Sequence, residues 1–292
     1  MMKSSSMIPD RRAKLFEGEG WLVAAGLLGF LLAAICGIYV LVNGGAVAPE
    51  GDVSKAFSFN AALGMFLIST AAIVPLSAMG KKSRAFFRWS YIVLALYSYF
   101  AENVQNFRGV DPRFVENGSA FDYAVGNAFA FVAFMLVLYY LVFAVLFFRS
   151  RAFRLRPGMV VAIRYSMIAV MLSFAAGIWI SVGQSRFTGM DGNIIWLHGL
   201  GFHALQAVPL VAWLAERSSP GGTARRSAIH VAGIGYLAGV IAIGWQTYLG
   251  KTVFEWSALP IAAAVCFLIS LAAGASTLRK APSSAGSMPL AK

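Results

Sequence analysis

Four polar side chains stand near the end of one long apolar stretch of the sequence. Their spacing of three and four positions places them on one face of a helix. The group consists of Ser98, Glu102, Gln105 and Asn106. A carboxylate about one turn inside a membrane helix costs a few kcal/mol unless it is paired or hydrated. The acidic member of this group therefore needs a partner.

We expect that partner to be Arg108 or Arg186, which can lie at the same level. The Ser98 hydroxyl, one turn deeper, can donate a hydrogen bond to the carboxylate. In the functional interpretation, Glu102 accepts a proton or holds a ligand. In the structural interpretation, it forms an interfacial ion pair that ends the helix and orders the loop at 107–120.

Two histidines follow Trp196 in another apolar stretch. His198 and His203 are five positions apart and point about 140° from each other, so they cannot form the i, i+4 pair of a zinc site. His203 shares a helix face with Gln206 and Gly199. This combination suits axial ligation of a haem, or a neutral histidine bonded to a substrate. A histidine bonded to Gln206 or to a neighbouring helix is the structural alternative.

These patterns assign roles to eight residues. Glu102 and His198 are the candidate catalytic residues, and His203 and Gln206 the candidate cofactor ligands. No metal ligands are assigned, and haem is the one cofactor that the pattern suggests. The substrate pocket is expected to include Ser98, Gln105, Asn106 and Trp196.

The composition indicates a membrane protein. Hydrophobic residues make up 59% of the chain, charged residues 12%, and the mean hydropathy is +0.71. A hydrocarbon core about 30 Å thick requires about 20 apolar residues per helix. Eight stretches have that length without the strict alternation of barrel strands, which predicts an all-α polytopic protein. They are 21–42, 57–79, 86–106, 121–148, 158–182, 193–214, 227–249 and 254–278.

The basic residues predict the orientation. Of the 24 Lys and Arg, 18 fall in the two tails and in alternate connections, which places both termini in the cytoplasm of a bacterial-type cell membrane. The net charge of +12 then reflects topology and contact with anionic lipids. We expect no nucleic-acid partner. Cys36 and Cys266 stand apart in apolar stretches, as packing residues do.

The second half of the sequence repeats the first. An even number of helices preserves orientation, so we predict two four-helix bundles related by a pseudo-twofold axis along the membrane normal. Four short segments recur in order, at offsets of 140, 134, 141 and 133 positions: 37–39 as 177–179, 74–76 as 208–210, 105–109 as 246–250, and 121–123 as 254–256.

This repeat divides the chain into five parts. The predicted boundaries are a cytoplasmic tail at 1–20, a first repeat at 21–148, a linker at 149–157, a second repeat at 158–278 and a cytoplasmic tail at 279–292. Small residues in the first and seventh stretches, such as Gly29 and Gly235, suit close helix packing. Pro75 and Pro209 are expected to kink the second and sixth helices.

The residues capable of chemistry are not repeated, which predicts one asymmetric, outward-facing pocket. By the local offsets, Glu102 aligns with Ile243, His198 with Gly64 and His203 with Ser69.

Eight helices in two four-helix copies resemble the haem A synthase architecture. That family places paired histidine ligands on the second and fourth helices of each half. The stretches at 57–79, 121–148 and 254–278 contain no histidine, so the resemblance covers helix number and duplication only.

Three functions fit the sequence. The first is a membrane-embedded enzyme or haem-handling protein acting on a lipid-like or small substrate. The second is a proton-coupled transporter of a small solute or lipid, in which Glu102 or Arg164 is essential. The third is a noncatalytic assembly or sensor subunit, which would tolerate Glu102→Gln together with His203→Ala.

Overall fold

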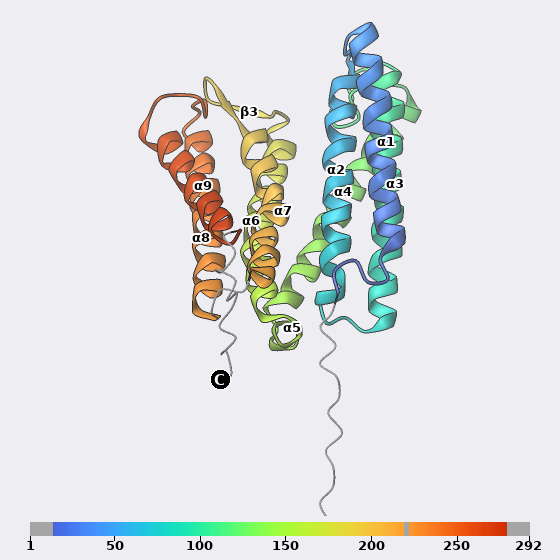
Figure 1. Cartoon of the computed structure of the whole chain (residues 1–292). Helices are drawn as coiled ribbons and strands as arrows, with labels where there is room; N and C mark the ends of the chain where they lie inside the picture. Colours follow the sequence, from blue (N-terminus) through green and yellow to red (C-terminus); the bar gives the residue numbers. More distant parts are fainter. Residues whose placement is uncertain (1–13, 219–221, 279–292) are drawn as a thin grey trace, which may run out of the picture.

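The structure is a computed structural model that describes residues 14–218 and 222–278, and it is an all-helical, multi-pass architecture (Figure 1). Among the described residues, seven helices are long and apolar enough to cross a membrane. They are α1 (Gly20–Asn43), α2 (Val53–Ile73) with the 3₁₀ turn η1 (Val74–Leu76), α4 (Ala120–Phe148), α6 (Pro157–Gly183), α7 (Ile194–Arg217), α8 (Gly222–Tyr248) and α9 (Ala258–Ser276).

Helix α3 (Lys81–Phe107) holds the remaining predicted stretch. It is as long as α6 but more polar. Four basic residues occupy its first two turns, and Glu102, Gln105 and Asn106 lie in its last two turns. It packs beside α1, α2 and α4. Eight membrane crossings therefore stay a prediction, while seven helices meet the length and composition of a span.

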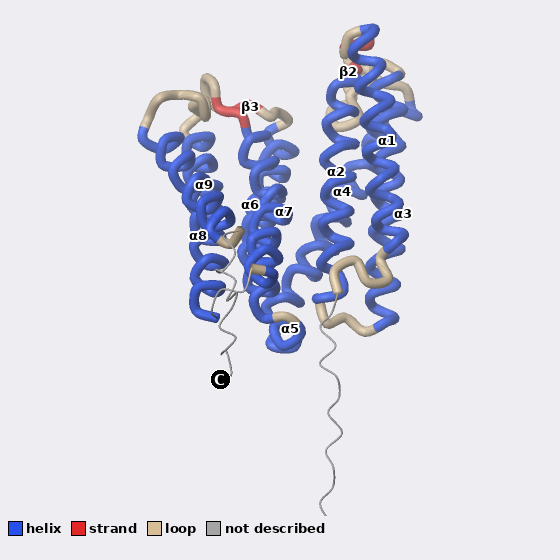
Figure 2. The backbone as a smooth tube through the Cα atoms, viewed as in Figure 1, coloured by secondary structure: helices blue, strands red, loops and turns tan. Residues whose placement is uncertain are grey.

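Two short hairpins mark one end of the molecule (Figure 2). Strands β1 (Ala46–Val47) and β2 (Gly51–Asp52) join α1 to α2, and β3 (Phe187–Thr188) and β4 (Gly192–Asn193) join α6 to α7. The sequence did not predict them. We name this the hairpin end. The opposite, basic end holds the Lys- and Arg-rich connections and a short helix, α5 (Ser150–Leu155), within the predicted linker.

Each hairpin bonds to the loop that follows the third long helix of its half. The Glu50 amide donates to the Gly109 carbonyl over 2.8 Å, and the Asp191 amide donates to the Gly250 carbonyl over 3.0 Å. Gly109 and Gly250 have φ of 81° and 72°, and a side chain on either would collide with the hairpin backbone. Only glycine suits both positions.

Small residues allow the helices to approach closely, as predicted. A Cβ added to Gly29 would lie 2.8 Å from the Asn60 carbonyl oxygen of α2. One added to Gly235 would lie 2.9 Å from the Cys266 carbonyl oxygen of α9. Replacing either glycine would separate its pair of helices. The prolines differ: Pro75 stands in η1, after α2 has ended, whereas Pro209 lies inside α7.

Four aromatic rings join the two halves of the molecule, α1–α4 and α6–α9. The Phe66 ring of α2 lies 4.7 Å from the Tyr140 ring of α4 and 4.9 Å from the Phe202 ring of α7. The Phe174 ring of α6 lies 5.3 Å from Phe202 and 5.8 Å from Tyr140. We call these residues the aromatic cluster. They belong to one hydrophobic core that continues through both halves.

The last helix starts later than the sequence predicted. The predicted last stretch begins at 254, but α9 begins at Ala258 because 253–257 form turns. Most of the predicted tail at 1–20, and all of that at 279–292, lies outside the described residues.

Candidate functional site

Four charged side chains gather at the hairpin end of the first half. Lys55 comes from the first turn of α2, which Asp52 caps by accepting a 2.8 Å hydrogen bond from the Ser54 amide. Lys55 Nζ lies 2.7 Å from Asp111 Oδ2, in the loop after α3. Glu102, near the end of α3, pairs with Arg113 of the same loop. The charge cluster is Lys55, Glu102, Asp111 and Arg113.

Glu102 is the most enclosed member of the charge cluster. Its side chain has no exposed surface, whereas 32% of the Arg113 side chain is exposed. The Arg113 guanidinium contacts Glu102 Oε1 and lies 5.6 Å from the centre of the Phe59 ring. Asn106 Nδ2 donates to Glu102 Oε2 over 3.2 Å. A buried carboxylate is thus neutralised by a cation that still reaches solvent.

The partners predicted for Glu102 were wrong. Arg108 Nη2 lies 3.2 Å from Asp122 Oδ1, at the start of α4. Arg186 lies over the Phe187 ring in the other half. The Ser98 hydroxyl donates to the Leu94 carbonyl over 2.9 Å, within its own helix. Arg113 reaches the carboxylate instead because the loop turns back toward the end of α3 after a 2.9 Å hydrogen bond from the Val110 amide to the Gln105 carbonyl.

Two of the predicted pocket residues hold the frame around Glu102. Asn106 bonds to the Glu102 carboxylate, and its Oδ1 accepts a 3.0 Å hydrogen bond from the Asp52 amide of the hairpin. Gln105 Nε2 donates to Asp122 Oδ1 over 3.1 Å. These amides join α3 to β2 and to α4, which fixes the position of the carboxylate.

Asp111 remains ionised next to this frame. Burial raises the pKa of its carboxyl, but the Lys55 ammonium and the Arg113 amide and guanidinium lower it more, so the pKa lies below the ordinary value. The net charge of the cluster is then zero when Glu102 is ionised and +1 when it is protonated.

His198 lies in the second half, on α7. Its Nδ1 lies 2.7 Å from the Ser173 carbonyl oxygen of α6, and its ring rests on Gly177 and meets the Phe202 ring edge-on at 4.9 Å. Among the described residues, the hydrogen-bond and ring contacts of His198 come from α6 and α7 of its own half, so the structure does not bring the two predicted catalytic residues into contact.

His203 and Gln206 lie apart from the charge cluster. His203 is exposed, and its Nδ1 lies 3.2 Å from Gln206 Oε1. Gln206 Nε2 donates to the Ser69 hydroxyl of α2 over 2.7 Å, so this pair connects the two halves. Trp196, assigned to the substrate pocket, packs its exposed indole edge-on against the Phe254 ring at 5.2 Å.

The histidines do not fit a haem held between two of them. His198 bonds to Ser173, His203 bonds to Gln206, and the third histidine, His230, lies 2.8 Å from the Tyr165 hydroxyl toward the basic end. Each imidazole has its own protein partner.

The sequence interpretation missed a polar network next to Glu102. Asn60 of α2 and Asn103 of α3 exchange two side-chain hydrogen bonds of 2.9 and 3.0 Å. Cys36 Sγ of α1 donates to Asn103 Oδ1 over 3.2 Å. The signal was an asparagine inside each of two apolar stretches, where an amide needs a partner. Arg113 and Asp111 were missed because loop residues carry no helical spacing.

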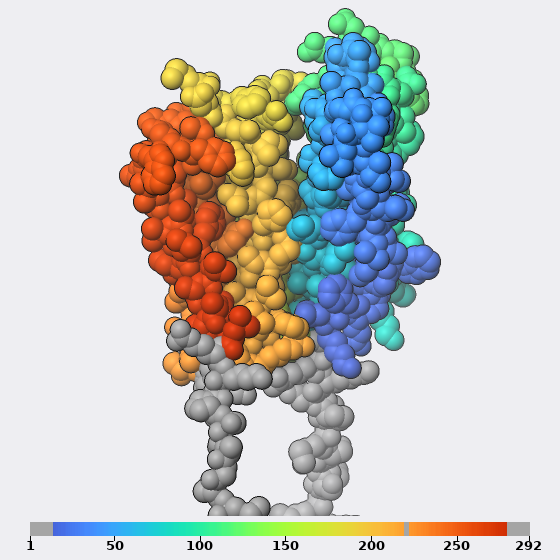
Figure 3. Space-filling model, turned by 45° about the horizontal axis from the view of Figure 1, so that its top comes forward, coloured from blue at the N-terminus to red at the C-terminus, as the bar shows by residue number. Residues whose placement is uncertain are grey.

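The two halves of the molecule separate toward the hairpin end. In Figure 3, which turns the hairpin end forward, a narrow opening divides the yellow surface of the second half from the blue and cyan surface of the first. Below it, the halves meet at Ser69–Gln206 and at the aromatic cluster. No protein-family model, curated protein or solved structure matches the chain.

Proposed function

We propose that this protein is a proton-coupled transporter of a small anionic solute, with its site at the charge cluster. The observation that carries the proposal is the pairing of a fully buried carboxylate, Glu102, with a partly exposed guanidinium, Arg113. Arginine binds carboxylate and phosphate groups through paired hydrogen bonds. A solute anion and the Glu102 carboxylate therefore compete for the same cation.

Proton coupling follows from this competition. Protonation of Glu102 removes its charge and leaves Arg113 without a counter-ion, which favours binding of the solute anion. Release of the proton restores the ion pair and expels the anion. The Asn106 amide keeps the carboxylate in place through this exchange, and Lys55 together with Asp111 anchors the loop that holds Arg113.

We infer that the hairpin end faces the outside and the basic end the cytoplasm. Support comes from the described Lys and Arg residues, which concentrate at the end opposite the hairpins. Such residues are enriched in cytoplasmic loops. The charge cluster and the opening in Figure 3 then face outward.

We also infer that the chain is a tandem repeat of four helices. Helix α1 ends at Asn43 and α6 at Gly183, an offset of 140. The hairpins pair Ala46 with Asp52 and Phe187 with Asn193, an offset of 141, so Ser185 is a one-residue insertion. Bonding after the third helix recurs as well: Gln246 Nε2 donates to Glu255 Oε2 over 3.0 Å, as Gln105 does to Asp122.

The hairpin contacts change the alignment of the site residues. An offset of 141 places His198 on Phe57 and His203 on Ala62, in place of Gly64 and Ser69. With this offset the two prolines no longer align, because Pro75 falls two helical turns beyond Pro209. The new alignment is supported by packing, because the Phe57 ring lies over Gly37 as the His198 ring lies over Gly177. Glu102 still aligns with Ile243.

A membrane-embedded enzyme using Glu102 and His198 is the second candidate. Its support is that Glu102 and His198 are both titratable side chains near the hairpin ends of their helices, α3 and α7. We rank it below the transporter because Glu102 is bonded to Arg113 and Asn106 and not to a histidine that could exchange a proton with it. A haem role has no pair of histidines to support it.

The test is an uptake measurement on proteoliposomes that contain the full chain, because one proton carried with one monovalent anion moves no net charge. Radiolabelled small carboxylates and inorganic phosphate, supplied outside at pH 5.5 and 7.5, should enter faster at pH 5.5 for at least one anion. Glu102→Gln should remove the dependence of this uptake on pH. Glu255→Gln is the matched control, since Glu255 lies at the same end but pairs with the exposed Lys251.

Three results would contradict the transporter. One is the absence of uptake of every anion when the protein is correctly folded. Another is an unchanged pH dependence in Glu102→Gln. A third is wild-type behaviour of Glu102→Gln combined with His203→Ala, which would indicate the assembly or sensor subunit.

A further inference from the structure

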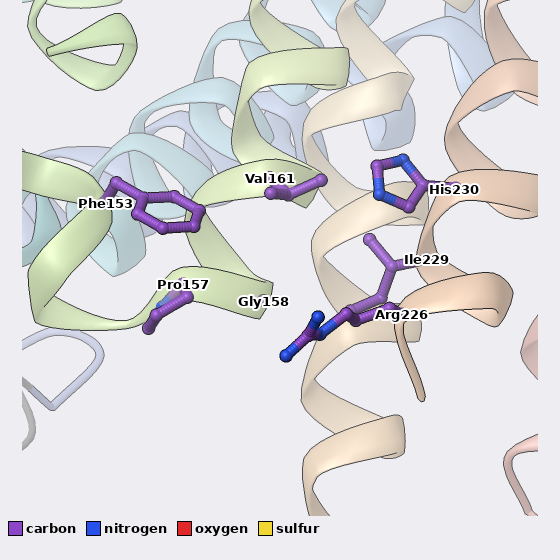
Figure 4. Close-up of a pocket in the computed structure, with 7 residues that line it drawn as sticks. All are labelled: Phe153, Pro157, Gly158, Val161, Arg226, Ile229 and His230. Atoms are coloured by element: carbon purple, nitrogen blue, oxygen red, sulfur yellow. The ribbon is translucent and has the colours of Figure 1, made fainter. Parts of the chain in front are cut away.

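A groove at the basic end lies between α5 and α6 on one side and α8 on the other (Figure 4). Its first part has a volume of about 450 Å³ and walls that are almost wholly apolar. Phe153, Val161 and Ile229 extend toward this space, and the Arg226 guanidinium lies at its edge (Figure 4).

The second part of the groove is cationic. It has a volume of about 390 Å³ and is continuous with the first part, since both are lined by Pro157, Gly158, Arg226 and Ile229. Arg154 and Arg225 line it as well. Arg156 is neutralised by a bidentate ion pair with Glu216, whereas within residues 14–218 and 222–278 the other three arginines of the groove form no ion pair.

We propose that this groove binds one anionic phospholipid, with the phosphate between Arg154, Arg225 and Arg226 and an acyl chain against Phe153 and Val161. Charge complementarity and the apolar continuation of the groove carry the proposal. Arginine recognises a phosphate through several N–H donors, and an acyl chain gains from leaving water. A free phosphate would use the cationic part alone.

The position of the groove agrees with this ligand. Its arginines belong to the basic end, where a cytoplasmic leaflet supplies anionic lipid headgroups. Notably, the Arg225 Nε is buried and has no hydrogen-bond acceptor among the described residues. A phosphate oxygen would supply one. The proposal is independent of the transport proposal, because the charge cluster lies at the other end of the molecule.

Native mass spectrometry of the full chain in detergent tests the proposal. Added phosphatidylglycerol should form a 1:1 complex, and phosphatidylcholine should bind more weakly. Neutralising Arg154, Arg225 and Arg226 to Gln should weaken phosphatidylglycerol binding by about fivefold for each arginine, and by about 100-fold together. A melting curve of each variant shows whether it is folded.

The control variant neutralises three basic residues at the same end but outside the groove, Lys81, Lys82 and Arg217, and should bind the lipid as wild type does. Equal losses in the two triple variants would overturn the proposal, because general surface charge would then explain the binding.

Val161→Trp separates the two sources of phosphate. This change fills the apolar part and leaves the arginines, so it should abolish the lipid complex. Inorganic phosphate at 10-fold excess should displace little lipid from the wild type. Retention of the lipid in Val161→Trp, or its complete displacement by phosphate, would show that a free anion is the ligand and would overturn the lipid proposal.

Discussion

The first and second halves of the molecule have the same hairpin frame but different interiors. Both contain a hairpin bonded to a glycine loop, and a glutamine that reaches the acidic residue beyond that loop. Inside the frame, the first half buries Glu102 and the Asn60–Asn103 pair, whereas the second has Ile243 and small or apolar residues at the aligned positions.

This difference separates scaffold from site. A frame of backbone hydrogen bonds and glycines does not constrain which side chains stand inside it, so one half can bury charge while the other keeps apolar packing. The charge is costly to bury unless it is paired. Glu102 is paired with Arg113 and accepts a hydrogen bond from Asn106.

The largest effect is expected from breaking the charge cluster. Arg113→Leu leaves Glu102 as a buried, unpaired carboxylate and should lower the free energy of unfolding by about 3 kcal/mol at pH 7.5, the low end for a broken buried pair because the Arg113 side chain is partly exposed. Unfolding in mixed micelles, followed by circular dichroism, measures this. Adding Glu102→Gln should restore more than half of the loss. Failure of that rescue would contradict a charge-based explanation.

The hairpin frame should respond equally in both halves. Gly109→Ala and Gly250→Ala each place a Cβ on a residue with positive φ and against a hairpin. Each change should lower the free energy of unfolding by about 2 kcal/mol. Gly199→Ala is the control, because a Cβ there meets nothing within 4 Å. Destabilisation confined to one of the two loops would mean that the frames are not equivalent.

The site residue of the second half should prove dispensable for folding. His198→Phe reproduces the Phe57–Gly37 contact of the first half. It should lower the free energy of unfolding by about 1 kcal/mol, because the hydrogen bond to Ser173 is lost. The same variant should alter the uptake of anions into proteoliposomes. If both stability and uptake are unchanged, His198 is not part of the site.

The Lys55–Asp111 pair should make the loop after α3 sensitive to acid. The Asp111 pKa is lower in the folded protein than in the unfolded chain, so the pair stabilises the fold above the ordinary carboxyl pKa, and this stability is lost as the pH falls below it. Lys55→Met should lower the free energy of unfolding by less than about 1 kcal/mol, because the lysine is partly exposed. Proteolysis of the loop between pH 3 and 6 measures the change; an effect that grows above pH 6 would contradict the assignment.

The smallest effect should come from the exposed ion pair of the second half. Lys251 and Glu255 lie 3.4 Å apart with both side chains over one third exposed, so Lys251→Met should change the free energy of unfolding by less than about 0.5 kcal/mol. A loss comparable to that of Arg113→Leu would remove the contrast between the halves. Circular dichroism under the same conditions gives the comparison.

The sequence predicted the long helices well because a span must be long and continuously apolar. Helix α3 was recognised by the same rule, although its basic start and polar end exclude it from the strict composition of a span. The hairpins escaped prediction because strands of two residues show no periodicity. Each is defined instead by a backbone bond to a distant glycine.

The surroundings of Glu102 were predicted in part. Burial of Glu102 and its need for a partner followed from its depth in the helix, but the identity of the partner depended on how the loop at 107–120 folds back. Sequence proximity favoured Arg108, which instead pairs with Asp122. The proposed alignment of His198 with Phe57 also required the hairpins, because short sequence matches do not reveal the hairpin register.

The aromatic cluster has a consequence for the membrane voltage. Phe66 lies 13 residues into α2 and Glu102 five residues from the end of α3, or roughly 20 and 8 Å from the hairpin end at 1.5 Å per residue. A proton reaching Glu102 from that side crosses little of the electric field. Onward passage must cross the aromatic layer, where most of the voltage falls, at about 2.3 kcal/mol per net charge per 100 mV. A proton that moves with one monovalent anion carries no net charge. The voltage should therefore leave binding at the charge cluster almost unaffected, and should act on the inward step only when the solute carries more than one negative charge.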